Sequence, residues 1–398
     1  MSVVSHLYHG ELGDWCETRL TGSAEVARQA AALVREQEVI RPEGPVDRHH
    51  WSQAGRTFAL RLAALIQPAP PYSALLGLAR IGLVSRSWAD AQAARYPTHA
   101  RLPEHLRRRA LDMCPTPGGW VDLRAARDGG TTPGAALGSP EEDHRRFSRP
   151  GLPDEPVLSE LFDRIRRYFA AHATLGRLGE PGPERGLARL CWILAAFQYA
   201  FRNDSYEHPL FRVFRDDVPS VEQLHGGVDD EAIADPLALT RRLSASGVLR
   251  QLRGLAGDPP VGTPWGIAGP VIFDHWDDHT FVLNGPDGAT LLEVVTLIKA
   301  DDSHNRGRRR IWKLLASAWL DTADAFRIRT VAVYYARHGV LVTWPVASLV
   351  ELLAEGGDPQ QTRNEFVGLA TRLRDEDRAR RAAWLAGRAT GNGLREDQ

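Results

Sequence analysis

Cysteine is rare in this sequence, and the pattern of its occurrences argues against small disulfide-bonded and zinc-ribbon folds. Cys16, Cys114 and Cys191 are far apart and form no Cys-x-x-Cys pair, so neither a disulfide framework nor a structural zinc site is expected. Few unpaired cysteines are typical of proteins in a reducing compartment. The cysteine content therefore predicts a cytoplasmic location.

Long hydrophobic runs are also missing. The longest apolar stretches, near Ile193–Ala200 and Leu291–Ile298, are far shorter than the roughly 20 residues that cross a bilayer. The N-terminus lacks a basic segment followed by an apolar one, so no signal peptide is expected. The formal net charge of −1 provides no overall field that would attract nucleic acid or a membrane. We expect no membrane partner, and any nucleic acid must bind a local patch.

Two common nucleotide-binding motifs are absent. No GxGxxG follows a predicted strand, and no GxxxxGK[ST] occurs. Dinucleotide-binding and P-loop folds are therefore not expected. The 398 residues are enough for one large domain or for two to three smaller ones.

The first part of the chain has the composition and periodicity of helices. It divides into an α-helical N-terminal region (1–114), a Pro/Gly-rich linker or long loop (115–157) and a second helical region (158–256). Individual helices are predicted at residues 20–40, 50–67, 72–93, 101–112, 160–173, 187–202 and 237–255.

Residues 257–355 have a different pattern, which predicts a small mixed sheet. Thr280–Leu283 and Thr290–Ile298 flank the turn sequence Asn284–Gly288 and therefore predict a β-hairpin. The second of these strands is apolar on both faces, which is typical of a central strand. A helix over 306–326 and strands at 330–335 and 340–344 follow, so the sheet includes a crossover. Residues 356–398 predict a charged C-terminal helix and tail.

Acidic side chains gather in this C-terminal unit. Asp274, Asp277 and Asp278 precede the first hairpin strand, and Glu293 lies in the middle of the apolar second strand. A carboxylate in such a strand is costly to desolvate unless it meets a cation or a metal ion. Glu293 is therefore either a metal ligand or one half of a structural ion pair.

The C-terminal unit resembles a known nuclease core. The segment LLEVVT (291–296) looks like the strand that usually reads acid-x-Lys-Thr in the PD-(D/E)XK superfamily. The segments LARLCWILAAFQYAFR (187–202), IWKLLASAWLDT (311–322) and RIRTVAVYYARHGVLVTWP (327–345) resemble a group of uncharacterised actinobacterial proteins with this core. The resemblance covers about half of the chain. It implies an α/β fold with a mixed sheet: a restriction-endonuclease-like C-terminal core with a mainly α-helical N-terminal region.

The resemblance also implies a site. In that superfamily an Asp and a Glu from neighbouring strands hold Mg²⁺, and a nearby Lys serves the attacking water. The matching metal ligands here are Glu293 and Asp278, with His279 in place of Asp278 if the register shifts by one residue. The expected lysine position is Val295, so the motif is degenerate.

Two lysines could replace the missing one. Lys299 would lie roughly 20 Å along the strand from Glu293, at about 3.3 Å per residue, which is too far. Lys313, in the first turns of the following helix, is the better candidate and completes a catalytic set of Asp278, Glu293 and Lys313. Alternatively, Lys313 lies on a solvated helix face, or Glu293 forms an ion pair with Arg309 or Lys313.

Other patterns allow weaker hypotheses. The run Arg306–Arg310 lies beside the candidate site, and phosphate could be bound by Arg306, Arg308, Arg309 and Arg310. Similar runs at Arg107–Arg109 and Arg378–Arg381 are more typical of solvated helix faces. A Zn²⁺ or Mn²⁺ site could form from His275, Asp277 and His279, although such clusters more often make turns. An exposed apolar patch could include Trp265, Trp276 and Trp312, although core packing is the usual role of such residues.

These observations lead to three functional hypotheses. The first is a degenerate PD-(D/E)XK-like protein that associates with DNA or RNA and has weak or no cleavage activity. The second is an active nuclease with Mg²⁺ as its cofactor, which would use Asp278, Glu293 and Lys313. The third is a protein-interaction scaffold without a nucleic-acid role.

Overall fold

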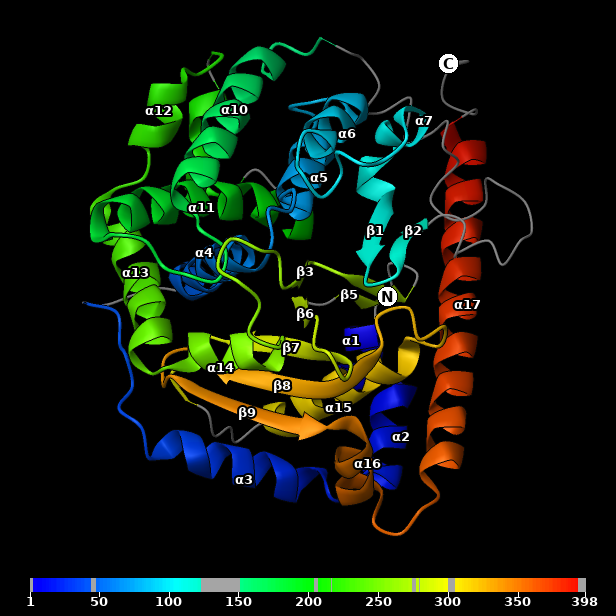
Figure 1. Cartoon of the computed structure of the whole chain (residues 1–398). Helices are drawn as coiled ribbons and strands as arrows, with labels where there is room; N and C mark the ends of the chain where they lie inside the picture. Colours follow the sequence, from blue (N-terminus) through cyan, green and yellow to red (C-terminus); the bar gives the residue numbers. More distant parts are fainter. Residues whose placement is uncertain are drawn as a thin grey trace.

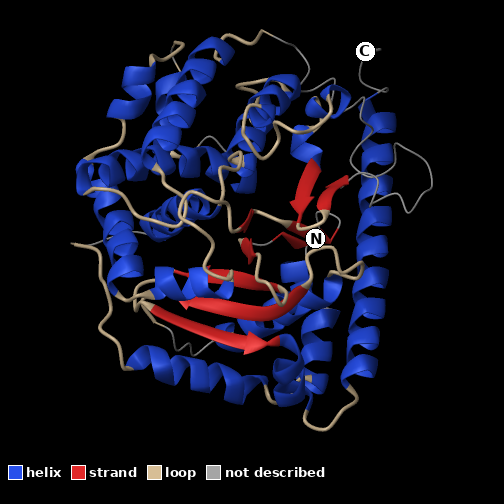
Figure 2. Ribbon diagram, in the orientation of Figure 1, coloured by secondary structure: helices blue, strands red, loops and turns tan. Residues whose placement is uncertain are grey.

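The computed structural model describes residues 3–43, 48–122, 151–203, 207–215, 217–273, 277–278, 280–299 and 305–392. Within these residues the chain is a mixed α/β protein in which helices surround one central sheet (Figure 2). None of the described helices combines the length and the apolar composition that crossing a bilayer requires.

The central sheet has five strands in the order β3-β6-β7-β8-β9 (Figure 1). Only β7 and β8 pair in parallel, and the other three pairs are antiparallel. The crossover between the parallel strands contains helix α15 (Arg306–Leu320). The predicted hairpin, crossover and central strand are thus confirmed. The strands are β3 (Gly266–Ala268), β6 (Phe281–Leu283), β7 (Ala289–Val295), β8 (Ile328–Tyr335) and β9 (Val340–Pro345).

Side chains of β7 alternate between two separate hydrophobic cores, as the period of a strand requires. Leu291 and Val295 pack against α15 in one core. Leu292 faces the other core, where α4 (Arg48–Ile66) contributes Phe58 and Leu62. Helices from both chain ends complete the α15 side: α1 (Val3–His9), α2 (Glu11–Arg19), α3 (Ser23–Arg35), α16 (Val346–Ala354) and α17 (Pro359–Asn392).

A third core lies within the helical region, and it joins residues on both sides of the predicted 115–157 linker. In this core α5 packs tightly against α11, where a Cβ on Gly77 would lie 2.1 Å from the carbonyl oxygen of Phe197. Glycine is required there because the two helix backbones almost touch. The helices of this region are α5 (Tyr72–Arg80), α6 (Arg86–Ala94), α7 (Glu104–Arg107), α10 (Glu155–His172), α11 (Pro181–Asn203), α12 (Val221–Gly226), α13 (Asp230–Ala245) and α14 (Val248–Leu255), with short 3₁₀ turns at Ala110–Asp112 and Pro209–Phe214.

Several predicted boundaries are wrong. The expected helix over 101–112 is only the single turn of α7 followed by a 3₁₀ turn. The expected helix over 237–255 is two helices, because Gly247 has a φ of +74° that ends the first. The expected linker begins with a hairpin of β1 (Met113–Thr116) and β2 (Gly119–Asp122), and its end belongs to α10. Residues 123–150 of that linker lie outside the described residues.

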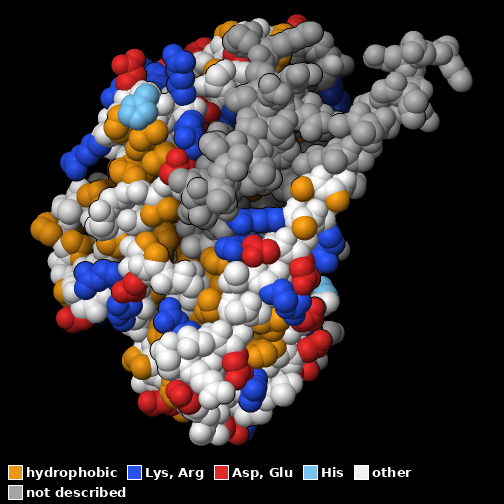
Figure 3. Space-filling model, turned by 90° about the vertical axis from the view of Figure 1, so that its right-hand side faces the viewer, with side chains coloured by type: hydrophobic (Ala, Val, Ile, Leu, Met, Phe, Trp, Pro, Cys, Tyr) orange, Lys and Arg blue, Asp and Glu red, His pale blue; other side chains and the backbone are white. Residues whose placement is uncertain are grey.

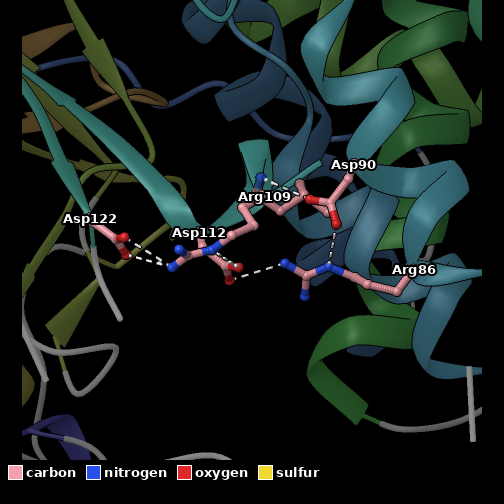
Figure 4. A network of polar contacts seen from close by, with 6 residues as sticks. Arg86, Asp90, Arg109, Asp112 and Asp122 are labelled. Carbon is pink, nitrogen blue, oxygen red and sulfur yellow. Dashed lines mark hydrogen bonds and ion pairs between the residues drawn. The ribbon is translucent and has the colours of Figure 1, made fainter. Parts of the chain in front are cut away.

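A network of ion pairs attaches the β1–β2 hairpin to α6 (Figure 4). Arg86 in α6 bonds Asp90 and Asp112 at 3.1 and 3.0 Å. Arg109 reaches Asp122 at the end of β2, with its shortest contact at 2.9 Å. Burial raises the pKa of Asp90 although Arg86 opposes that shift. The network therefore fixes the hairpin by charge as well as by packing.

Candidate functional site

Glu293 lies near the carboxyl end of β7 and shares its face with Leu291 and Val295, toward α15. Its Oε1 is 3.7 Å from Arg310 Nε, and its Oε2 is 3.5 Å from Lys313 Nζ. The Glu293 side chain is only 18% exposed. The candidate acid therefore lies beside two cations from one helix, in a largely buried position.

One turn of α15 supplies both cations. Arg310 and Lys313 are three residues apart, so they project from the same face of the helix. Arg310 also lies over the ring of Tyr335, with 5.7 Å between its Cζ and the ring centroid. Arg309, which the sequence had suggested as the partner of Glu293, lies instead over the ring of Tyr8 at 5.0 Å. The reason is rotational, because consecutive helical residues point about 100° apart.

The predicted phosphate-binding run is largely engaged within the protein. Arg308 lies over the Trp312 ring and forms an ion pair with Glu17 of α2 at 3.3 Å. Arg309 lies on Tyr8 and Arg310 lies beside Glu293, so these arginines also contact other parts of the chain. Arg306 begins α15.

The basic run at 378–381 is compensated by acids, as predicted for a solvated helix face. Arg378 and Arg380 pair with Asp375 and Asp377 on the same helix. The face of the molecule that includes α17 shows basic and acidic side chains interspersed (Figure 3).

The lysine position of the resembled motif is filled by a core residue. Val295 is 5% exposed and packs in the α15 core. Lys299 is exposed and follows the end of β7, so the extended spacing assumed for it does not apply. Of the two candidate lysines, Lys313 is the one that contacts Glu293.

The second metal ligand of the resembled motif is only partly described. The backbone of Asp278 lies in β5 (Asp277–Asp278), which pairs with β4 (Val271–Phe273) as a separate two-stranded sheet. The side chains of 274–279 lie outside the described residues, and so do the alternative ligand His279 and the proposed zinc site of His275, Asp277 and His279. Elsewhere in the described part of the chain, no three His, Cys, Asp or Glu side chains lie together as a metal site requires.

The proposed patch of exposed tryptophans does not form. Trp265 and Trp312 are 2% and 1% exposed and belong to the cores, and Trp276 lies outside the described residues. The indole nitrogen of Trp312 donates a hydrogen bond of 2.7 Å to the buried Ser23 hydroxyl. Both residues pack the interior, as is usual for their type.

A second carboxylate beside cations was missed by the sequence reasoning. Asp235 of α13 accepts two bonds from Arg337, at 2.8 and 2.6 Å, and lies 3.2 Å from His50. Arg337 also donates to the carbonyl of Thr296 at 2.6 Å and lies over the Trp51 ring. We call Asp235, Arg337, His50 and Trp51 the Asp235 cluster. The cluster joins the helical region to the end of β8. Its members are up to 287 positions apart (337 minus 50), so no local signal reveals them.

A large cavity lies between α4 and the sheet, with a volume of about 1450 Å³. One face of α4 lines it from Trp51 to Gln67, and Val294 and Thr296 lie on the opposite side. Lys313 also lines it, so the cavity reaches the Glu293 site. The sequence predicted a helix at 50–67 but did not reveal its cavity-lining face.

Comparison with family models, with curated proteins and with solved structures finds no match to this chain.

Proposed function

We propose that this chain is a cytoplasmic, nucleic-acid-associated protein with a degenerate PD-(D/E)XK core and weak or no cleavage activity. One observation carries the proposal: Glu293 has its charge neutralised by Arg310 and Lys313, while the expected lysine position, two residues after Glu293, is the buried Val295. A carboxylate held by two cations in a low-dielectric site binds a divalent ion poorly, because the ion must compete with both.

The order of the elements supports a restriction-endonuclease-like core. The hairpin of β6 and β7, the helix α15 and the parallel strand β8 follow one another in the order that the resemblance implies. Glu293 lies in the second hairpin strand, at the position of the superfamily's acid.

Electrostatics support an association with nucleic acid. Helix α15 carries four arginines, one lysine and no carboxylate, and its N-terminus adds the positive end of the helix dipole. Although several of these side chains contact the protein, their combined field favours a phosphate near the Glu293 site.

A Mg²⁺-dependent nuclease using Asp278, Glu293 and Lys313 is the rival proposal. The distance of 3.5 Å between Lys313 Nζ and Glu293 Oε2 favours this rival, because a relocated catalytic lysine must lie beside the metal-binding carboxylate. The described surroundings of Glu293 fit a metal ion poorly, however, because Arg310 and Lys313 would compete with the ion for its carboxylate.

The test compares binding and cleavage in the full-length protein. Single- and double-stranded DNA and RNA are incubated with Mg²⁺ or Mn²⁺, using wild type and Glu293→Gln. The proposal predicts that wild type binds and retards the nucleic acid. It also predicts that wild type cleaves the nucleic acid no more than Glu293→Gln does. Cleavage that disappears in a folded Glu293→Gln variant would establish the rival nuclease. Binding of no nucleic acid would overturn both and would favour a protein-interaction role.

A further inference from the structure

The cavity beside α4 is lined along that helix from Trp51 to Gln67, the residue that follows it. In the middle of this wall Gly55, Ala59 and Ala63 recur every four residues and so lie on one side of the helix. Sixteen residues at 1.5 Å each give a length of about 24 Å. We call this space the α4 groove.

Small side chains on α4 leave this space open, and buried ion pairs fix its walls. On the far side of α4, Arg61 bonds Glu184 of α11 at 2.8 and 2.6 Å. Near the start of α4, the Asp235 cluster holds Trp51 against Arg337. Bidentate pairs of this kind are geometrically rigid. The α4 groove is therefore preformed.

The charges that line the α4 groove have one sign. Its lining includes Arg56, Arg95, Arg166 and Lys313, and no carboxylate among the described residues. Arg95 and Arg166 share a single acid, Asp163, at 2.6 and 2.9 Å. A groove with an excess of cations attracts an anionic ligand.

The cations belong to both ends of the α4 groove. One end is near Gly55, where an added Cβ would lie 2.7 Å from the hydroxyl of Thr296. Thr296 follows Glu293 closely in the chain, and Glu293 contacts Lys313, so Lys313 belongs to this end. At the other end Thr98, three residues after Arg95, bonds the carbonyl of Pro68 at 3.2 Å. A ligand with one charged head would need cations at a single end. Cations at both ends match a polymer with repeated phosphates.

Aromatic side chains add surfaces on which bases can stack. Several line the α4 groove: Trp51, Tyr72, Tyr96, Phe169 and Phe201. Cations combined with aromatic rings are the pattern of proteins that bind single strands, where bases stack on the rings and cations contact the phosphates.

We propose that the α4 groove binds a single strand of nucleic acid and excludes a duplex. This rests on the proposed function and identifies which form of nucleic acid the protein takes. At a stacked spacing of about 3.4 Å per nucleotide, the groove holds roughly seven nucleotides. A duplex is excluded, because its bases are stacked on and paired with one another and do not reach the aromatic side chains that line the groove.

The test measures the binding of fluorescent oligonucleotides to the full-length protein by anisotropy, without divalent ions. The probes are a 12-nucleotide single strand of mixed sequence, as DNA and as RNA, and a 20-base-pair duplex. Ala59→Trp fills the middle of the groove, and Arg56→Gln removes one lining charge. The matched controls are Ala24→Trp and Arg28→Gln on α3, where both residues are exposed and outside the groove.

We expect the single strand to bind at least tenfold more tightly than the duplex. Ala59→Trp should weaken single-strand binding at least tenfold, and Arg56→Gln should weaken it several-fold and reduce its salt dependence, while both controls match wild type. Thermal melting of each variant shows whether it is folded.

Equal binding of the duplex, or single-strand binding unaffected by Ala59→Trp and Arg56→Gln, would overturn the groove assignment while leaving the proposed function intact. Binding of neither probe would overturn both. Thermal stabilisation by dodecanoate but by no oligonucleotide would assign the groove to an amphipathic anion and would also overturn the inference.

Discussion

Asp235 and Glu293 each lie beside two basic side chains, and the geometries of the two carboxylates differ. Asp235 bonds Arg337 at 2.6 and 2.8 Å, and the two side chains are 2% and 0% exposed. Glu293 lies 3.5 and 3.7 Å from its cations, with side chains that are 11–20% exposed. The first arrangement has the distances of charge-assisted hydrogen bonds, and the second has those of looser ion pairs.

The comparison shows how a structural charge differs from one that a ligand can reach. Arg337 has its guanidinium satisfied by Asp235 and by the carbonyls of Thr296 and Ile40. Lys313 is the more exposed cation and lines the α4 groove. An approaching phosphate can therefore compete for Lys313 but cannot reach Arg337.

The largest expected effect is on stability, from Asp235→Ala. This change leaves the guanidinium of Arg337 buried without its counter-charge, which costs about 3–5 kcal/mol. Urea-induced unfolding followed by tryptophan fluorescence measures the loss. As a control, Glu25→Ala removes the acid of an exposed pair with Arg28 and should cost less than about 1 kcal/mol. If Asp235→Ala lowered the free energy of unfolding by less than about 1 kcal/mol, the structural role of the Asp235 cluster would be contradicted.

The second expected effect is acid sensitivity of the helical region that contains Asp235. Burial lowers the pKa of His99 and of His208 to about 4, whereas the unfolded value is about 6.5. Because the folded state keeps both rings neutral, stability is complete above pH 6.5 and falls as the pH drops toward 4. Each histidine should contribute a loss of about 2 kcal/mol between pH 7 and pH 5.

Urea midpoints at several pH values check this expectation. His99→Gln and His208→Gln should each flatten the profile between pH 6.5 and 4. A profile that both variants leave unchanged would show that other groups control the acid response.

The smallest expected effect comes from Glu293→Gln. Its ion pairs are longer and more exposed than those of Asp235, so we expect a stability loss of about 1–2 kcal/mol, which added salt reduces. Lys313→Met should lose less, because Arg310 still neutralises Glu293. Urea unfolding at low and high salt measures both losses. A loss from Glu293→Gln equal to that from Asp235→Ala would remove the distinction between the two carboxylates.

The C-terminal unit could be predicted because its signals are local. The turn at Asn284–Gly288 fixes the β6–β7 hairpin, and the helical spacing of α15 indicates the crossover. The candidate acid Glu293 could be found because a charge within an apolar strand is conspicuous in the sequence. Its neighbour Lys313 followed from the order of elements.

The rest depends on contacts between distant segments. The partner of Glu293 is Arg310 and not Arg309, a difference of one helical step that periodicity alone does not resolve. Asp235 and Arg337 are 102 positions apart, and the α4 groove is lined by α4, α10 and the sheet. Such sites form only when helices pack at angles that the sequence does not specify locally.

The central claim is that Glu293 is an ion-pair residue and not a metal ligand, and Mn²⁺ titration calorimetry of wild type and Glu293→Gln tests it most directly. The account predicts the same titration curve for both proteins. One-to-one Mn²⁺ binding by wild type that is lost in a folded Glu293→Gln variant would contradict the account and make Glu293 a metal ligand.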